Sequence, residues 1–398
     1  MANPQLLIDQ LKLLVGTPDS YGTEEQRHEI KRLGRLASNV LEAPFETMQR
    51  LPLPLVAARI GQDCHVFSTL AAGQDSVDLD TISQASGLEP RILESIMDYL
   101  CTQGMAVQTE SHRYLPTPMS RLLLVPLFGD AVTHFVRSHD NCLPGFTALH
   151  RALKEPRGST LTAFQLGQHT DEDFYTWMET HPTSQAAFHR FMEAQFASLP
   201  TWLDVLDFKT ELGCDAESTD VMFVDVGGGN GSLCAGLRRA WPDMTGKMIL
   251  QDKPQVLERA LQVEGVEKMG HDFVREQPVK SEFNVDLYQC TSLLFPPDHD
   301  NYDDDVCITI LKAHIGAMGN HSVILIDDKV LPDAKPPPDA PRVEYTAALS
   351  LAMKVMFDAM ERRESHWRDL LSRAGLAIQE IRKFTKFDDA IIIARKAY

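Results

Sequence analysis

The stretch that most constrains the fold of this chain covers residues 221–240. It opens with the apolar run VMFVDV, rich in β-branched residues and typical of a strand buried on both faces. A GGGNG turn follows, and residues 233–240 carry helix formers at helical spacing. Strand, glycine turn and helix form the first unit of a doubly wound α/β nucleotide-binding domain. In such a unit the glycines admit a ligand close to the backbone, and the helix N-terminus presents free N–H groups.

The surroundings of this turn narrow the choice of ligand. A glycine turn alone fits NAD, FAD or S-adenosylmethionine (SAM), and it is also compatible with a plain tight turn. The turn lacks the G-x-G-x-x-G spacing of the dinucleotide fingerprint. Asp225 stands just before the glycines, where its carboxylate could meet a ligand ammonium group, and Asp252 ends the next apolar run, where it could bind both ribose hydroxyls. These features favour SAM.

Composition limits the class of protein. With 398 residues, the chain suggests two domains, or one large domain with an extension. Its net charge of −18 argues against a nucleic-acid partner. We find no apolar run long enough for a bilayer, no signal peptide and no cysteine spacing typical of a metal site or a disulfide framework. We therefore expect a cytoplasmic protein with free thiols and no bound metal.

Residues 1–125 are expected to form a helical and winged-helix domain. A leucine-rich helix leads, and a helix over residues 79–86, a second over 89–103 and a hairpin over 105–117 follow. Over this second helix and its C-terminal end we expect Ile92, Ile96, Leu100 and Met105 to face inward. That helix carries one arginine and two acidic residues, a charge pattern that does not favour binding to the phosphate backbone of DNA. The domain is therefore interpreted as a dimerisation module of a homodimer.

The rest of the chain divides into two parts. Residues 126–210 are predicted to form a helical linker and the roof of a pocket, where His134 and His139 are candidate catalytic groups, although a lone histidine is more often structural. Residues 211–398 alternate strand and helix, which predicts an α/β, Rossmann-like domain. Its strands are expected at residues 221–226, 247–251, 285–289, 322–327 and 390–395.

Several further motifs point to a known family. They read QDKP from residue 251, HDF from 271, QPV from 277, LIDD from 325 and VLP from 330. With the glycine turn, they resemble the fungal SAM-dependent small-molecule O-methyltransferases over nearly the whole chain from residue 50. The resemblance implies a winged-helix dimerisation domain and a bound SAM. The ligand would be lined by Asp225, Gly227, Gly228, Gly229, Asn230 and Gly231, with Asp252 on the ribose and Asp272 and Phe273 flanking the adenine.

The chain departs from this family at the catalytic base. The family normally has a basic residue and then Leu-His-Asp-Trp after the fourth strand, and the histidine deprotonates the acceptor hydroxyl. Here Thr291 takes the place of the basic residue and Phe295 that of the base, and the connection is longer by about five residues. His299 could serve as base if this loop folds back, although its proline and aspartate neighbours are typical of a solvated loop. Asp328 and Glu361 match the two acids that orient the family's histidine.

Lys329 is a second departure, because the family usually has a neutral residue there. It follows Asp328 at the carboxyl end of a strand, where ligands bind in such sheets. Its ammonium could donate to a substrate carbonyl and stabilise negative charge on that oxygen. The alternative is an ion pair with Asp327, Asp328 or Asp333.

Three functions remain in competition. The departures resemble the leporin-type pericyclases, fungal proteins of this fold that bind SAM and act on pyridone polyketide intermediates. In that reading SAM is bound but not consumed, Lys329 is the donor, and His134 or His139 assists. The second reading is an O-methyltransferase acting on a small phenolic substrate, with His299 as base and Asp328 and Glu361 in support. The third is a non-catalytic SAM-binding regulator.

Overall fold

The computed structural model describes residues 4–17, 22–41, 54–126, 128–130, 140–154, 161–198, 200–212, 221–280, 285–289, 304–334 and 341–397. The chain divides into two compact units, Met1–Leu124 with Pro337–Val343, and Val125–Pro336 with Glu344–Tyr398. Residues 126–210, expected as a layer of their own, fall within the second unit. No helix within the described ranges is long and apolar enough to cross a membrane.

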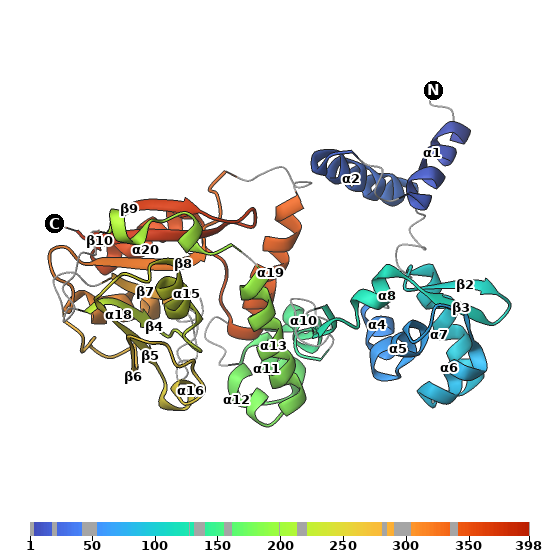
Figure 1. The fold of residues 1–398 in the computed structure, drawn as a ribbon, viewed down its shortest axis with the longest axis horizontal. Coiled ribbons are helices and arrows are strands. Elements are labelled where there is room, and N and C mark those ends of the chain that lie inside the picture. The colour runs from blue at the N-terminus through green and yellow to red at the C-terminus, as the bar shows by residue number, and fades with distance from the viewer. Residues whose placement is uncertain are drawn as a thin grey trace. The chain divides into compact units, whose positions relative to one another are not determined.

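The first unit contains a helix–turn–helix pair followed by a hairpin (Figure 1). Its elements are α1 (Pro4–Gly16), α2 (Glu24–Leu41), α4 (Pro54–Asp63), α5 (Val66–Ala71), β1 (Val77–Asp78), α6 (Leu79–Ser86), α7 (Pro90–Thr102), β2 (Ala106–Glu110), β3 (Arg113–Pro116) and α8 (Pro118–Leu122). Asp78 caps α6 by accepting a hydrogen bond from the backbone N–H of Thr81, and Gly87 ends that helix in the left-handed conformation. Strand β3 pairs antiparallel with both β1 and β2. This small sheet supplies the expected wing.

Helix α7 buries only part of the expected face. Leu100 and Met105 are buried as expected, whereas Ile92 is 54% exposed and Leu93 and Met97 are buried instead. Two sets of positions satisfy helical spacing: 92, 96 and 100 form one set, and 93, 97 and 100 form the other. Periodicity alone therefore cannot tell which set is buried. The contacts of α7 with α4 and α6 decide the face.

The second unit is built on a seven-stranded sheet with the order β6-β5-β4-β7-β8-β10-β9 (Figure 1). The strands are β4 (Val221–Val226), β5 (Lys247–Asp252), β6 (Val266–Gly270), β7 (Val285–Gln289), β8 (Val323–Lys329), β9 (Leu376–Lys383) and β10 (Asp389–Lys396). Strands β4 to β8 pair in parallel, and β10 runs antiparallel to β8 and β9. The five predicted strands are confirmed to within two residues at each end. Strands β6 and β9 were not predicted, because they form the sheet edges and lack a continuous apolar run.

Helices cover both faces of this sheet. The remaining helices are α10 (Leu143–Ala152), α11 (Ala163–Gln168), α12 (Phe174–Glu179), α13 (Pro182–Ser198), α14 (Phe208–Glu211), α15 (Ser232–Ala240), α16 (Pro254–Leu257), α18 (Asp304–Ile315), α19 (Pro341–Phe357) and α20 (Glu364–Ala374), with a 3₁₀ turn at Trp202–Asp204. Residues of α11, α12 and α19 pack together in a cluster of their own. Helices α18 and α20 pack on one face in a cluster with Val226 and Ile326. Helices α14 and α15 pack on the other with Phe223 and Leu250. The carboxyl ends of the parallel strands therefore meet at one edge of a sheet that is buried on both faces.

Candidate active site

The glycine turn after β4 closes tightly around one carboxylate. Gly229 and Gly231 have φ angles of 58° and 77°, in the left-handed region that favours glycine. A Cβ atom on Gly228 would lie 2.3 Å from Cγ of Asp225, so no side chain fits there without movement. Because residue 228 has no side chain, the backbone of the turn lies directly against the carboxyl group of Asp225.

Asp225 is the buried acid of this turn. Its side chain is 0% exposed, and its Oδ2 accepts a hydrogen bond from Sγ of Cys234 at 3.5 Å. Its Oδ1 is buried and has no hydrogen-bond partner among the described residues. Burial raises the pKa of Asp225 to about 7. A buried carboxylate oxygen without a donor is costly, so this atom is suited to a ligand cation.

Asp252 reaches the same turn from the end of β5. Its Oδ2 accepts the backbone N–H of Gly229 at 2.9 Å, and its Oδ1 accepts that of Lys253 at 2.7 Å. Burial raises its pKa as well. The side-chain oxygen of Asn230, a residue expected to contact the ligand, accepts the N–H of Ser232, the first residue of α15, at 3.0 Å.

Asp272 and Phe273 follow β6 at the same edge of the sheet. Strand β6 pairs with β5 so that Gly270 stands opposite Asp252. Asp272 is exposed, and its Oδ1 accepts the N–H of Val274 at 3.2 Å. Phe273 is half-buried against the cluster that α18 covers.

These groups fit SAM. The buried Asp225 oxygen without a donor suits an ammonium group, and the left-handed glycines allow close approach. Asp252 and the segment after β6 would hold the ribose and the adenine.

Substitution of Gly228 by alanine tests this cradle. The new Cβ would also meet Cδ1 of Leu250 at 2.5 Å, so Asp225 or the turn must shift. We expect SAM affinity to fall at least tenfold and the free energy of unfolding to fall by about 1–3 kcal/mol. Isothermal titration and thermal unfolding measure both. Gly236→Ala is the matched control, because its Cβ would meet only the tip of Leu203 at 3.3 Å. Unchanged SAM affinity in Gly228→Ala would contradict the cradle.

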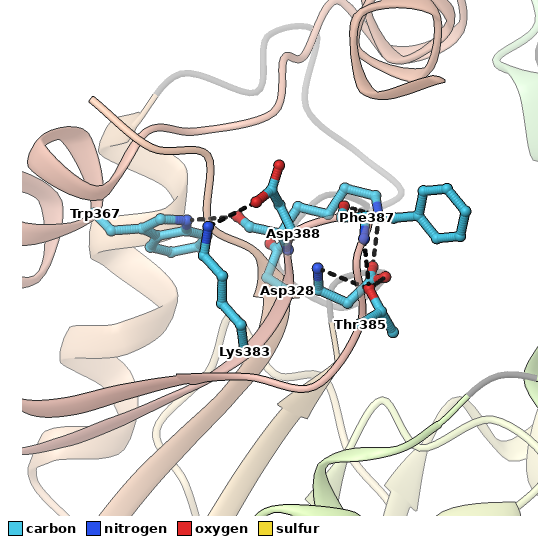
Figure 2. Close-up of polar contacts among 8 residues, drawn as sticks. Asp328, Trp367, Lys383, Thr385, Phe387 and Asp388 are labelled. Carbon is cyan, nitrogen blue, oxygen red and sulfur yellow. Dashed lines mark hydrogen bonds and ion pairs between the residues drawn. The ribbon is translucent and has the colours of Figure 1, made fainter. Parts of the chain in front are cut away.

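Lys329 is the last residue of β8, and its ammonium contacts the turn between β9 and β10. Figure 2 shows this turn with Thr385, Phe387 and Asp388 labelled. Its Nζ forms an ion pair with Oδ1 of Asp389 at 2.5 Å and donates to the carbonyl oxygen of Phe387 at 3.1 Å. The side chain is 9% exposed, and Nζ lies 5.5 Å from the ring centroid of Tyr345. The ion pair of Lys329 is thus formed with Asp389.

This partner corrects the expected ion pair with Asp327, Asp328 or Asp333. Strand β10 runs antiparallel to β8, and its register places Asp389 opposite Lys329. The carboxylate of Asp333 instead accepts hydrogen bonds from Ser365. Register between strands distant in sequence is not encoded locally, so the sequence offered no means of choosing Asp389.

Glu361 is brought to the same strand end by backbone pairing. The N–H of Leu331 donates to the carbonyl oxygen of Arg362 at 3.0 Å, which holds the segment before α20 alongside the end of β8. Burial and the nearby Asp328 raise the pKa of Glu361. Burial also raises the pKa of Asp327 to about 8, and Asp328 adds to this shift. Both carboxyl groups near Lys329 therefore hold their protons to a higher pH than ordinary carboxyl groups.

Five candidate residues lie outside the described parts of the chain: His134, His139, Thr291, Phe295 and His299. Their roles stay predictions. Four residues escaped the sequence analysis, namely Asp389, Tyr345, Phe387 and Cys234. Only Asp389 left a signal, since it directly precedes the last predicted strand.

The fold and the site together define a class of protein. A largely parallel sheet, a glycine turn after its first strand and acids at the ends of that strand and the next are the features of a Rossmann-like, SAM-binding methyltransferase domain. Residues 168–377 match the O-methyltransferase domain family, and the chain belongs to that family. The family's cofactor is SAM.

Known proteins resemble the chain over nearly its full length. The 16-O-methyltransferase bsc6 of Alternaria brassicicola is 31% identical over 366 residues, which is 90% of this chain and 88% of that relative. The structure of LepI in complex with SAM has a TM-score of 0.79 and 26% identity and covers 100% of both chains. A structure described as a pericyclic reaction enzyme has a TM-score of 0.78 and 26% identity, covering 99% of this chain and 100% of the other. The resemblance inferred from the motifs is confirmed, and the chain is an enzyme on an O-methyltransferase fold.

Proposed function

We propose that this enzyme is a pericyclase, which holds SAM without consuming it and promotes dehydration and cyclisation of a pyridone polyketide intermediate. The observation that carries the proposal is the buried Lys329 ammonium at the ligand-binding edge of the sheet. Asp389 and Phe387 take two of its N–H groups, and no described residue takes the third. The likeness to a pericyclic reaction enzyme over nearly the whole chain supports the same reading.

The third N–H of Lys329 would donate to a carbonyl oxygen of the substrate. Such a donor stabilises negative charge as it develops on that oxygen, most strongly in a site shielded from water. Burial opposes the charge of Lys329, but the Asp389 carboxylate outweighs it and raises the pKa of the lysine. The protonated Glu361 would in turn donate to a departing hydroxyl group. Bound SAM would add a sulfonium charge to this end of the sheet.

Cofactor binding is assigned to the other half of the edge. Asp225 would pair with the ammonium group of SAM, and Asp252 would accept from the ribose hydroxyls. Asp272 and Phe273 would flank the adenine. The unpartnered Oδ1 of Asp225 supports this assignment.

One mass-spectrometric assay tests the proposal. The purified protein is incubated with SAM and with phenols, hydroxypyridones and their dehydration-prone alcohol precursors. Both S-adenosylhomocysteine and substrate mass are followed. We expect loss of water, or isomerisation at constant mass, with SAM intact. Turnover that requires formation of S-adenosylhomocysteine would contradict the proposal.

An O-methyltransferase is the second candidate. It is favoured by the 31% identity to a 16-O-methyltransferase and by the presence of Asp328 and Glu361 at the end of β8. In this reading His299 is the base, and the assay yields S-adenosylhomocysteine with a methyl mass gain. SAM binding without turnover of any substrate would instead favour the third reading, a regulator.

We also propose that the protein is a homodimer joined through α1 and α2. Helix α1 has no buried residue, and Leu7 and Leu11, which share one face a turn apart, are both exposed. Exposed leucines on one helix face favour a second copy as the partner. Light scattering should give twice the 44.6 kDa chain mass, and Leu7→Glu with Leu11→Glu should halve it. Lys12→Glu, a charge change on the same helix, should leave the dimer intact. A monomeric wild-type protein would rule the dimer out.

A further inference from the structure

We propose that Asp389 is a positioning residue that fixes the direction of the Lys329 ammonium, and that Thr385 holds Asp389 in the required orientation. The inference rests on the proposed role of Lys329 as the donor to the substrate. It assigns a task to a turn that lies outside the cofactor half of the site.

The turn between β9 and β10 is organised by one hydroxyl group (Figure 2). The Oγ1 of Thr385 donates to Oδ2 of Asp389. The same oxygen accepts the backbone N–H groups of Phe387 at 3.1 Å and Asp389 at 3.3 Å. This pattern holds the backbone of the turn so that the carbonyl oxygen of Phe387 reaches Lys329.

The carboxylate of Asp389 is fixed through both of its oxygens. Oδ2 is held by Thr385 and Oδ1 by Lys329. The lysine is fixed at its other end as well, because Nε1 of Trp367 donates to its carbonyl oxygen at 3.0 Å (Figure 2). With two N–H groups of Nζ directed to Asp389 and Phe387, the direction of the third is set.

Asp389 also decides whether Lys329 keeps its proton. The charged or titratable groups that face Lys329 are Asp389 on β10, Tyr345 on α19, Glu361 before α20 and Asp327 on its own strand. Asp389 is the one in direct contact at 2.5 Å. Without its carboxylate, burial would dominate and the ammonium would lose its proton at a lower pH.

A second ion pair in the same turn supplies the control. Nζ of Lys383 lies 2.6 Å from Oδ1 of Asp388, whose side chain is buried (Figure 2). Removal of this pair loosens the same turn but leaves the hydrogen bonds of Thr385, Asp389 and Lys329 in place. Lys383→Met therefore measures the effect of loosening alone.

The experiment compares Thr385→Val, Thr385→Ser, Asp389→Asn and Lys383→Met in the mass-spectrometric assay, with thermal unfolding to verify the fold. For Thr385→Val we expect kcat to fall about tenfold, because a hydrogen bond to a charged group is lost, with the Kd for SAM within about twofold. Thr385→Ser should restore kcat. Asp389→Asn should move the alkaline limb of the pH–rate profile to lower pH. Lys383→Met should keep the wild-type kcat and profile.

Two results would overturn the positioning role. One is an equal kcat in Thr385→Val and Lys383→Met, and the other is an unmoved alkaline limb in Asp389→Asn. Lys329→Met separates this failure from failure of the proposed function. If Lys329→Met is inactive while the Thr385 and Asp389 variants behave as wild type, only the inference fails. If Lys329→Met turns over normally, the proposed role of the lysine fails and the inference with it.

Discussion

Replacement of Asp225 by asparagine should weaken SAM binding at pH 8 about 30-fold, measured by isothermal titration. The asparagine is nearly isosteric but cannot pair as an anion with an ammonium group, and a hydrogen bond between charged groups contributes about 2 kcal/mol. Asp225 is fully buried and its Oδ1 has no hydrogen-bond partner among the described residues, so this oxygen is available to the ammonium group. Equal affinities in the two proteins would remove Asp225 from the cofactor site.

The pH dependence of SAM affinity should also differ between the wild-type protein and Asp225→Asn. Burial raises the pKa of Asp225 to about 7, so below that pH the carboxyl must release its proton before it can pair with a cation. Wild-type affinity should therefore fall about tenfold per pH unit between pH 7 and pH 5.5, and Asp225→Asn should stay flat.

In the cofactor-free protein, the contribution of Asp225 to the free energy of unfolding should fall as the pH rises, whereas its contribution to SAM affinity rises with pH. A carboxyl group whose pKa is raised by folding contributes stability below its unfolded pKa near 4, and this contribution is lost as the pH rises through about 7. Asp225→Asn should therefore raise the free energy of unfolding of the cofactor-free protein at pH 8, and it should have little effect near pH 3.5.

Replacement of Lys329 by methionine should reduce product formation by about a hundredfold or more while the Kd for SAM changes less than about twofold. Loss of one donor to a developing oxyanion typically has an effect of this size. The cofactor site we propose lies at the ends of β4 and β5 and in the segment after β6, away from Lys329, so SAM binding should remain.

Stability must be measured beside activity, because Lys329→Met leaves the Asp389 carboxylate without its cation. We expect a loss of about 2 kcal/mol, which the double variant Lys329→Met with Asp389→Asn should largely recover. Recovered stability with activity still lost would separate catalysis from folding. Parallel losses of SAM affinity and product formation would make Lys329 a structural residue only.

The cofactor half of the site was largely readable from the sequence. Val221–Val226 is a continuous apolar run, and the glycines beside Asp225 have few other uses in such a place. The edge strands β6 and β9 were missed because their half-exposed residues interrupt the apolar pattern. The buried face of α7 was predicted only in part, because two rows of residues satisfied the same period: Leu100 is buried as expected, but Ile92 is exposed.

The substrate half of the site depended on contacts that no local pattern encodes. Lys329 was singled out because it stands at a strand end, but its partner is 60 residues away in the sequence. The carbonyl oxygen of Phe387 that accepts a second N–H of Lys329 belongs to a turn with no recognisable motif. The residue that faces Lys329 depends on which strand pairs with β8 and in which register.

The position of β10 joins the integrity of the sheet to the charge of Lys329. This strand lies between β8 and β9, and it carries the anion that neutralises Lys329. Any change that detaches β10 would therefore separate β9 from the rest of the sheet and leave the lysine without its carboxylate at the same time.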